Sequence, residues 1–224
     1  MRSPHISPNE YYHVYNRGVN RATTFTDVED FARFIFLITH FQSLIEFKKP
    51  GRSLPFFITN GIFETSDQSV KEIVNRRTVE LVAFTLMTNH FHLILKESRG
   101  GGIANFMGRV LNSYTKYFNT RYKRTGHLFE GPYKAVRVKN NNQLLHLSAY
   151  VHKNPRDIPL WRDRELAYPY GSYQDFVKRN RFGKLLSHEI VTEQFQDEIS
   201  YKKFVDGSSL RKWGRELGSV HLFD

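Results

Sequence analysis

A chain of 224 residues without a single cysteine can form neither disulfides nor zinc–thiolate sites, which fits a reducing, intracellular setting. No apolar run approaches the roughly 20 residues that span a bilayer, and residues 1–18 hold no apolar core of a signal peptide, so we expect neither a membrane partner nor secretion. The formal net charge of +11 excludes an acidic surface and indicates a polyanionic partner, such as nucleic acid.

The first half of the chain begins with a strand pattern and continues with a helix pattern. Residues 11–18, rich in aromatic and β-branched side chains, predict a strand, and His13 is interpreted as an ordinary strand residue unless this strand neighbours a histidine-bearing one. Thr26 is a helix cap, and apolar residues at helical spacing extend the predicted helix from about residue 27 to 47. A long connection follows, with a short strand expected at 56–59 and a short helix at 68–76.

Residues 79–96 predict two apolar strands that meet at a tight turn, Thr88-Asn89. Alternate side chains of a strand share a face, so we expect His90 and His92 on one face and Phe91 on the other. Two imidazoles about 6–7 Å apart on a rigid element could bind one metal ion. The same His-x-His pattern also occurs in strands that bind nothing.

A strong basic bias follows a glycine hinge at residues 100–102. A helix is expected from 103 to about 122 and an edge strand at 133–138, and between residues 101 and 139 Glu130 is the only acid. Tyrosines and phenylalanines alternate with the cations, which suits unpaired bases and phosphates. The alternative is a solvated helix face followed by a basic loop. The residues expected to bind DNA are Arg109, Lys116, Arg121, Lys123, Arg124, Lys134 and Arg137.

A last well-marked helix is expected between Asn140 and Asn154. Asn140 is a cap with Gln143 as its capping-box partner, and Pro155 disfavours helix at Asn154. Tyr150 and Asn154, four residues apart, share the face of the last turn. A tyrosine in a helix usually only packs. If His90, His92 and the Asn154 amide oxygen held Mg²⁺ or Mn²⁺, however, Tyr150 could attack a phosphate aligned by that ion.

Five motifs together resemble a known family: YHVYNRG, AFTLMTNHFHLIL, TGHLFEGPYKA, SAYVHKNP and YPYGSY. In this order, over about residues 10–176, they resemble the single-tyrosine HUH transposases (IS200-like), most closely the REP-associated tyrosine transposases. The sequence departs from the family pattern at Thr88, where proline is usual, and at Pro132, where arginine is common.

The resemblance implies an α+β, ferredoxin-like HUH endonuclease fold with a central antiparallel sheet. It implies metal-dependent cleavage and rejoining of single-stranded DNA beside hairpins through a 5′-phosphotyrosine. By position, His90 and His92 would be the metal histidines, Tyr150 the nucleophile and Asn154 the residue that completes the metal shell. The stretch 121–139 would contact DNA. Tyr114 and Tyr117 are rival nucleophiles.

We expect residues 1–178 to form the transposase domain and residues 179–224 a C-terminal helical extension of unknown role, with helices near 192–205 and 209–217. The expected location is the bacterial cytoplasm, in association with the nucleoid. A homodimer is left open, in which Tyr150 would dock in its own subunit or in the partner. Two alternatives compete with the transposase: a replication-initiator or relaxase-type nickase, and a binding module for structured DNA or RNA that has lost catalysis.

Overall fold

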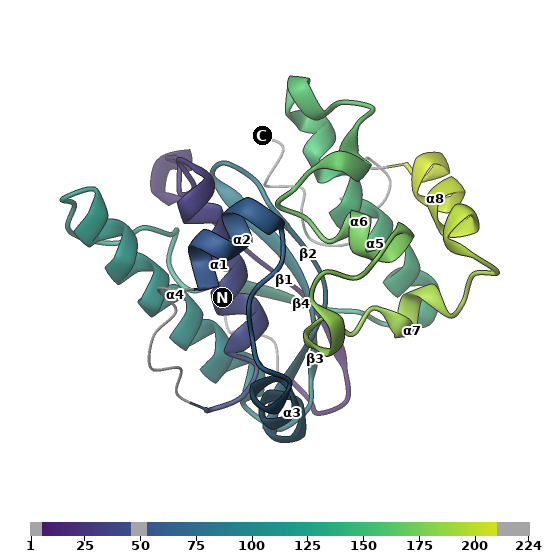
Figure 1. Cartoon of the computed structure of the whole chain (residues 1–224), viewed down its shortest axis with the longest axis horizontal. Coiled ribbons are helices and arrows are strands. Elements are labelled where there is room, and N and C mark those ends of the chain that lie inside the picture. Colours follow the sequence, from purple (N-terminus) through teal and green to yellow (C-terminus); the bar gives the residue numbers. More distant parts are fainter. Residues whose placement is uncertain (1–5, 46–52, 210–224) are drawn as a thin grey trace.

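The computed structural model describes residues 6–45 and 53–209, and within them the chain builds a four-stranded antiparallel sheet in the order β2-β3-β1-β4 (Figure 1). The strands are β1 (Tyr11–Arg17), β2 (Val79–Leu86), β3 (His90–Glu97) and β4 (Lys134–Arg137). The predicted α+β class with a central antiparallel sheet is confirmed. The strand order, with helical connections after β1 and after β3, is that of a ferredoxin-like fold.

Two helices cover one face of the sheet and a third covers the other, as Figure 1 shows. On the first face lie α1 (Val28–His40) and α4 (Gly102–Arg121), where Phe34 packs against Phe91 with ring centroids 5.0 Å apart. The second face carries α5 (Asn141–Lys153), tied to β2 because Thr85 Oγ1 donates to the Val151 carbonyl at 2.7 Å. The histidines of β3 face α5.

The capping signals of α5 form as predicted. The side chain of Asn140 accepts a hydrogen bond from the Gln143 amide at 2.9 Å. In return, the Gln143 side chain accepts from the Lys139 amide at 2.6 Å. These bonds fix where the helix begins, and thereby where Tyr150 lies along the sheet.

Three local predictions were wrong. The cap of α1 is Asp27, whose side chain accepts from the Glu29 and Asp30 amides, and not Thr26. Residues 56–59 lie in helix α2 (Ser53–Asn60) and not in a strand, because Pro55 lacks a strand's N–H yet fits a first helical turn. Helix α1 ends at His40, short of the predicted residue 47, because the chain turns there and the Gln42 carbonyl accepts from the Thr78 amide at 2.7 Å. Residues 46 and 47 lie outside the described residues.

The remaining elements are short and lie mostly beside α5. The described helices also include α3 (Asp67–Arg76), close to its prediction, and α6 (Tyr173–Val177), α7 (Glu189–Thr192) and α8 (Glu198–Gly207). Single 3-10 turns occur at Val19–Arg21, Asn154–Asp157, Pro159–Trp161, Glu165–Ala167 and Gly183–Leu185. Within the described parts of the chain, no helix is long and apolar enough to cross a membrane.

The segment after residue 178 packs into the same core as the rest of the chain. Phe182 packs edge-on against Phe84 with ring centroids 5.6 Å apart, and the Ser187 amide donates to the Leu81 carbonyl at 2.8 Å. The predicted helix at 192–205 corresponds largely to α8, whereas 210–217 lies outside the described residues. The domain boundary at 178 stays a prediction.

Candidate active site

His90 and His92 lie side by side on β3, next to strand β1. In the register of the two strands, His92 faces Tyr15 and His90 faces Arg17. The two imidazole centroids are 5.1 Å apart with the rings almost perpendicular. His92 is fully buried, whereas His90 is partly exposed.

Helix α5 brings Tyr150 and Asn154 to the same place. The Tyr150 ring stands perpendicular to His92 with centroids 5.4 Å apart. The Asn154 amide group donates to the Tyr150 carbonyl at 2.9 Å, and its side chain also forms a hydrogen bond with His90. The four residues predicted for the site therefore gather within one chain, with Tyr150 at the histidines of its own subunit.

His13 belongs to this cluster, the outcome expected if its strand neighbours the histidine strand, although an ordinary strand residue was the favoured interpretation. Strand β1 is the neighbour of β3, and His13 Nε2 lies 2.9 Å from His92 Nδ1 with both rings buried. The other ring nitrogen of His92, Nε2, is buried and has no hydrogen-bond partner among the described residues. A buried imidazole nitrogen without a partner is costly in a folded protein, unless a ligand completes it.

Both histidines are held neutral. Burial, and secondarily the Arg17 guanidinium, lowers the pKa of His90 to about 4, although its hydrogen bond with Asn154 opposes the change. Burial lowers the pKa of His92 well below its ordinary value, and His13, His90 and Arg17 add to the effect. Neutral imidazoles keep a lone pair at neutral pH, as a metal ligand must.

The donor set fits a divalent ion held by mixed nitrogen and oxygen ligands. In residues 6–45 and 53–209 no cluster of three or more histidine, cysteine, aspartate or glutamate side chains is arranged to hold a metal. The donors at this site are two imidazoles and the amide of Asn154, which is outside that set of residue types. The partnerless Nε2 of His92 is the observation that favours a ligand here.

The rival tyrosines lie on α4, across the sheet from the histidines. Tyr114 is fully buried, and its hydroxyl donates to the Thr24 carbonyl at 2.6 Å. The Tyr117 hydroxyl donates to Asp30 at 3.0 Å. Neither hydroxyl faces His90 or His92.

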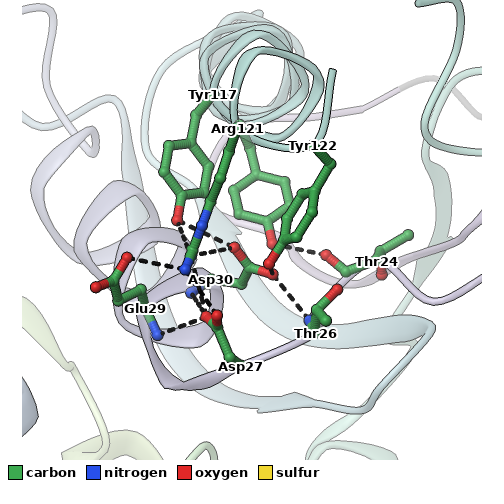
Figure 2. A network of polar contacts seen from close by, with 9 residues as sticks. Thr24, Thr26, Asp27, Glu29, Asp30, Tyr117, Arg121 and Tyr122 are labelled. Carbon is green, nitrogen blue, oxygen red and sulfur yellow. Dashed lines mark hydrogen bonds and ion pairs between the residues drawn. The ribbon is translucent and has the colours of Figure 1, made fainter. Parts of the chain in front are cut away.

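Three of the seven cations predicted to bind DNA have protein acceptors. Arg121 forms ion pairs with Asp27 (2.7 Å), Glu29 (3.0 Å) and Asp30 (3.0 Å), the network drawn in Figure 2. The other two are Arg109, which donates to main-chain carbonyls of Phe41, Ser43 and Ile45, and Arg137, which pairs with Glu10 at 2.6 Å.

The other four cations are exposed. Two of them lie over aromatic rings and a third lines a groove. Lys134 stands opposite Tyr15 on the same sheet face as His92, with its Nζ 5.8 Å from the Tyr15 ring. Arg124 lies over the Phe118 ring, with its guanidinium carbon 5.7 Å from the ring centroid. Lys123, its neighbour in the sequence, is exposed like Arg124. Lys116 lines a groove of about 500 Å³ between α4 and residues 127–133. The basic stretch thus divides into a structural part and a solvent-facing part.

The family model described as "Transposase IS200 like" matches residues 55–154, a span that includes His90, His92, Tyr150 and Asn154. A solved structure titled as a REP-associated tyrosine transposase bound to a REP hairpin superposes with a TM-score of 0.51 over 81% of this chain and 87% of that chain. Its sequence identity of 12% makes this a likeness of fold. No curated protein matches the chain. Residues 55–154 therefore match the IS200-like transposase family and the fold resembles that of a REP-associated tyrosine transposase, the similarity that the motifs predicted.

Proposed function

We propose that this chain cleaves and rejoins single-stranded DNA beside hairpins, with Tyr150 as the nucleophile that forms a 5′-phosphotyrosine. The observation that carries the proposal is the position of the Tyr150 ring, which stands perpendicular to His92 with the ring centroids 5.4 Å apart. Within residues 6–45 and 53–209, the buried Nε2 of His92 has no hydrogen-bond partner. A nucleophile next to an incomplete ligand set is the arrangement that phosphoryl transfer by an aligned tyrosine needs.

His90, His92 and Asn154 would hold Mg²⁺ or Mn²⁺. When bound, the ion would neutralise charge on the scissile phosphate and orient it. The protein's own part is to keep both imidazoles neutral by burial and to aim them from one rigid strand. Asn154 occupies the last turn of the same helix that carries Tyr150, so ligand and nucleophile are positioned together.

The chemical step is an in-line exchange of one phosphate ester for another. The Tyr150 oxygen forms a bond to phosphorus as the bond to the 3′ oxygen breaks, and the proton lost from the phenol balances the proton gained by the released 3′-OH. Because the phosphotyrosine retains the ester, attack by another 3′-OH rejoins strands without ATP. The protein fixes the direction of attack through α5.

The exposed cations would hold the DNA backbone. Lys134 shares the sheet face of the histidines, whereas Lys116 lies on α4, which covers the other face, and Lys123 and Arg124 follow the end of α4. Arg109, Arg121 and Arg137 would support this surface through their protein contacts. Aromatic residues between the cations offer platforms for unpaired bases. A hairpin is the natural partner to test, because the structural neighbour is bound to a REP hairpin.

We propose that Tyr150 acts in its own subunit, whether or not the protein is a homodimer, because its ring already lies beside His92 of the same chain. We place the activity on DNA in the bacterial cytoplasm, at the nucleoid. No contact among the described residues favours the nickase or the binding-module alternative, and the binding module is an outcome of the experiment below.

The test compares Tyr150→Phe with Tyr114→Phe on labelled hairpin DNA carrying single-stranded flanks. We expect Tyr150→Phe to bind DNA like the wild type and to cleave none of it in Mg²⁺ or Mn²⁺. Tyr114→Phe, which removes a hydroxyl on the other side of the sheet, should still cleave. Binding without cleavage by the wild type would instead establish the binding-module reading.

A further inference from the structure

Helix α8, from the segment beyond residue 178, makes polar contacts to the helix that carries Tyr150. The fully buried Tyr201 hydroxyl lies 2.8 Å from His152 Nδ1 and donates to Ser148 Oγ at 3.0 Å. Ser148 and His152 both belong to α5, one turn apart. Figure 1 shows α8 next to α5, on the side of α5 away from α1 and α4.

These contacts are on the far side of α5 from the active site. At about 100° per residue, Ser148 and His152 each project about 160° away from Tyr150, whereas Asn154 projects about 40° from it. The helix therefore presents its nucleophile to the histidines of β3 and its opposite face to Tyr201. A side chain that is hydrogen-bonded to the opposite face of α5 restricts the rotation of the helix about its axis and its distance from the sheet. Both quantities determine where Tyr150 lies.

The hydrogen-bond chain continues from α5 to the sheet. His152 Nε2 lies 2.9 Å from Ser172 Oγ, which accepts from the Phe84 amide of β2 at 2.9 Å. Ser172 Oγ also lies 3.2 Å from the Phe84 carbonyl, to which it can donate, so the donors and acceptors at His152 depend on its tautomer. If Ser172 donates to His152 Nε2, then His152 Nδ1–H donates to Tyr201 and Tyr201 donates to Ser148. In either tautomer the Tyr201 hydroxyl is hydrogen-bonded to α5.

A second contact holds the end of α5. Lys153 Nζ donates to the carbonyls of Asp206 at 3.0 Å and Ser208 at 2.8 Å, at the C-terminal end of α8. Lys153 is the neighbour of Asn154, the proposed ligand. The α8 helix thus contacts α5 at two consecutive turns that bracket Tyr150 in the sequence.

We propose that Tyr201 is a positioning residue, which clamps α5 so that Tyr150 stays aligned with the histidines of its own chain. This proposal rests on the proposed phosphotyrosine chemistry for its functional consequence. In this proposal, residues 198–208 hold α5, the helix that carries Tyr150, in position.

The chain offers a matched pair of variants for the test. Tyr201→Phe removes the hydroxyl that bonds His152 and Ser148 but keeps the ring. Tyr173→Phe makes the same change in a neighbouring ring, which stacks on His152, whereas Tyr201 meets His152 edge-on. The buried Tyr173 hydroxyl has no hydrogen-bond partner among the described residues. Ser148→Ala removes the acceptor of the Tyr201 hydrogen bond, and it replaces Tyr201→Phe in the test if that variant folds poorly.

Two readouts are needed: hydrogen exchange of the α5 amides without DNA, and the rate of adduct formation at saturating hairpin DNA. For Tyr201→Phe we expect amides of residues 147–153 to exchange at least about fivefold faster. We expect adduct formation at least about fivefold slower with DNA affinity unchanged. Ser148→Ala should shift both in the same direction, and Tyr173→Phe neither.

The proposal is overturned if Tyr201→Phe and Tyr173→Phe behave alike in both readouts. It is also overturned if Tyr201→Phe weakens DNA binding while the rate of adduct formation at saturating DNA stays unchanged. The exchange measurement needs no catalysis. If the wild type forms no adduct at all, the proposed function fails. In that case, faster exchange of the α5 amides in Tyr201→Phe but not in Tyr173→Phe still supports the clamp on α5. Equal exchange in the two variants rejects the clamp.

Discussion

Nε2 of His13 lies 2.9 Å from Nδ1 of His92, so two buried imidazoles on neighbouring strands share one hydrogen bond. For His92 Nε2 to offer a lone pair, its Nδ1 must carry the proton and donate to His13. His13 therefore selects the tautomer of His92 and the direction in which Nε2 points, a role that outer partners of metal-binding histidines commonly have.

This relationship predicts a metal-affinity effect of His13. His13→Leu should weaken Mn²⁺ binding by about 10–100-fold, the usual cost of losing such a partner. His13→Gln, which can still accept the bond, should lose less. Titration of the DNA-free protein with Mn²⁺, followed by electron paramagnetic resonance of the unbound ion, measures this. Wild-type affinity in a folded His13→Leu variant would contradict the assigned role.

Arg121 should matter for stability more than for DNA affinity. It closes a network between α4 and the start of α1, in which it pairs with the fully buried Asp30 (Figure 2). Arg121→Gln leaves that carboxylate without its cation, so we expect a loss of about 2 kcal/mol in unfolding free energy, discounted for the partial exposure of the arginine. Lys116→Gln, an exposed change on the same helix, is the control for urea denaturation and should be neutral.

Lys134 should contribute to DNA binding through a phosphate. Removal of one phosphate contact reduces the slope of log K against log salt by about 0.7 for single strands. We expect Lys134→Gln to show this reduction in fluorescence anisotropy titrations across a salt series. Lys71→Gln, an exposed change on α3 outside the basic stretch, should leave the slope unchanged. An unchanged slope for Lys134→Gln would show that Lys134 makes no phosphate contact.

Buried neutral histidines predict loss of stability in acid. Burial lowers the pKa of His40 to about 4 and that of His152 to about 3. The unfolded chain binds these protons near pH 6.5 and the folded chain does not, so the stabilisation is complete above pH 6.5 and is lost as pH falls toward the folded pKa values. Each histidine should cost about 2 kcal/mol between pH 6.5 and 5. Urea denaturation at both pH values measures it, and equal stability would contradict the burial.

The sequence was a good guide to which side chains share a face, because that follows from the geometry of a single strand or helix. The alternating pattern of residues 79–96 predicted β2, β3 and the shared face of His90 and His92, because side-chain direction follows from strand geometry alone. The Asn140 cap and Pro155 bounded α5, so the common face of Tyr150 and Asn154 followed from helix geometry.

What the sequence could not provide was pairing between distant segments. His13 joins His92 only through the register of β1 with β3, which no local pattern encodes. Arg121 looked like a free cation because its acidic partners lie more than 90 residues earlier in the chain. The contact of Tyr201 with α5 likewise spans about fifty residues. A search for acids placed to neutralise the basic helix would have flagged Asp27 and Asp30, since both stand at the start of the first predicted helix.

The measurement that tests the central claim most directly is the identity of the residue that carries DNA. Wild-type protein is incubated with labelled hairpin DNA and Mg²⁺ or Mn²⁺, and the covalent product is digested and mapped by peptide mass spectrometry. The account predicts a nucleotide adduct on the peptide that contains Tyr150, absent when a chelator is present. An adduct on a peptide with Tyr114 or Tyr117, or tight hairpin binding without any adduct in either metal, would contradict it.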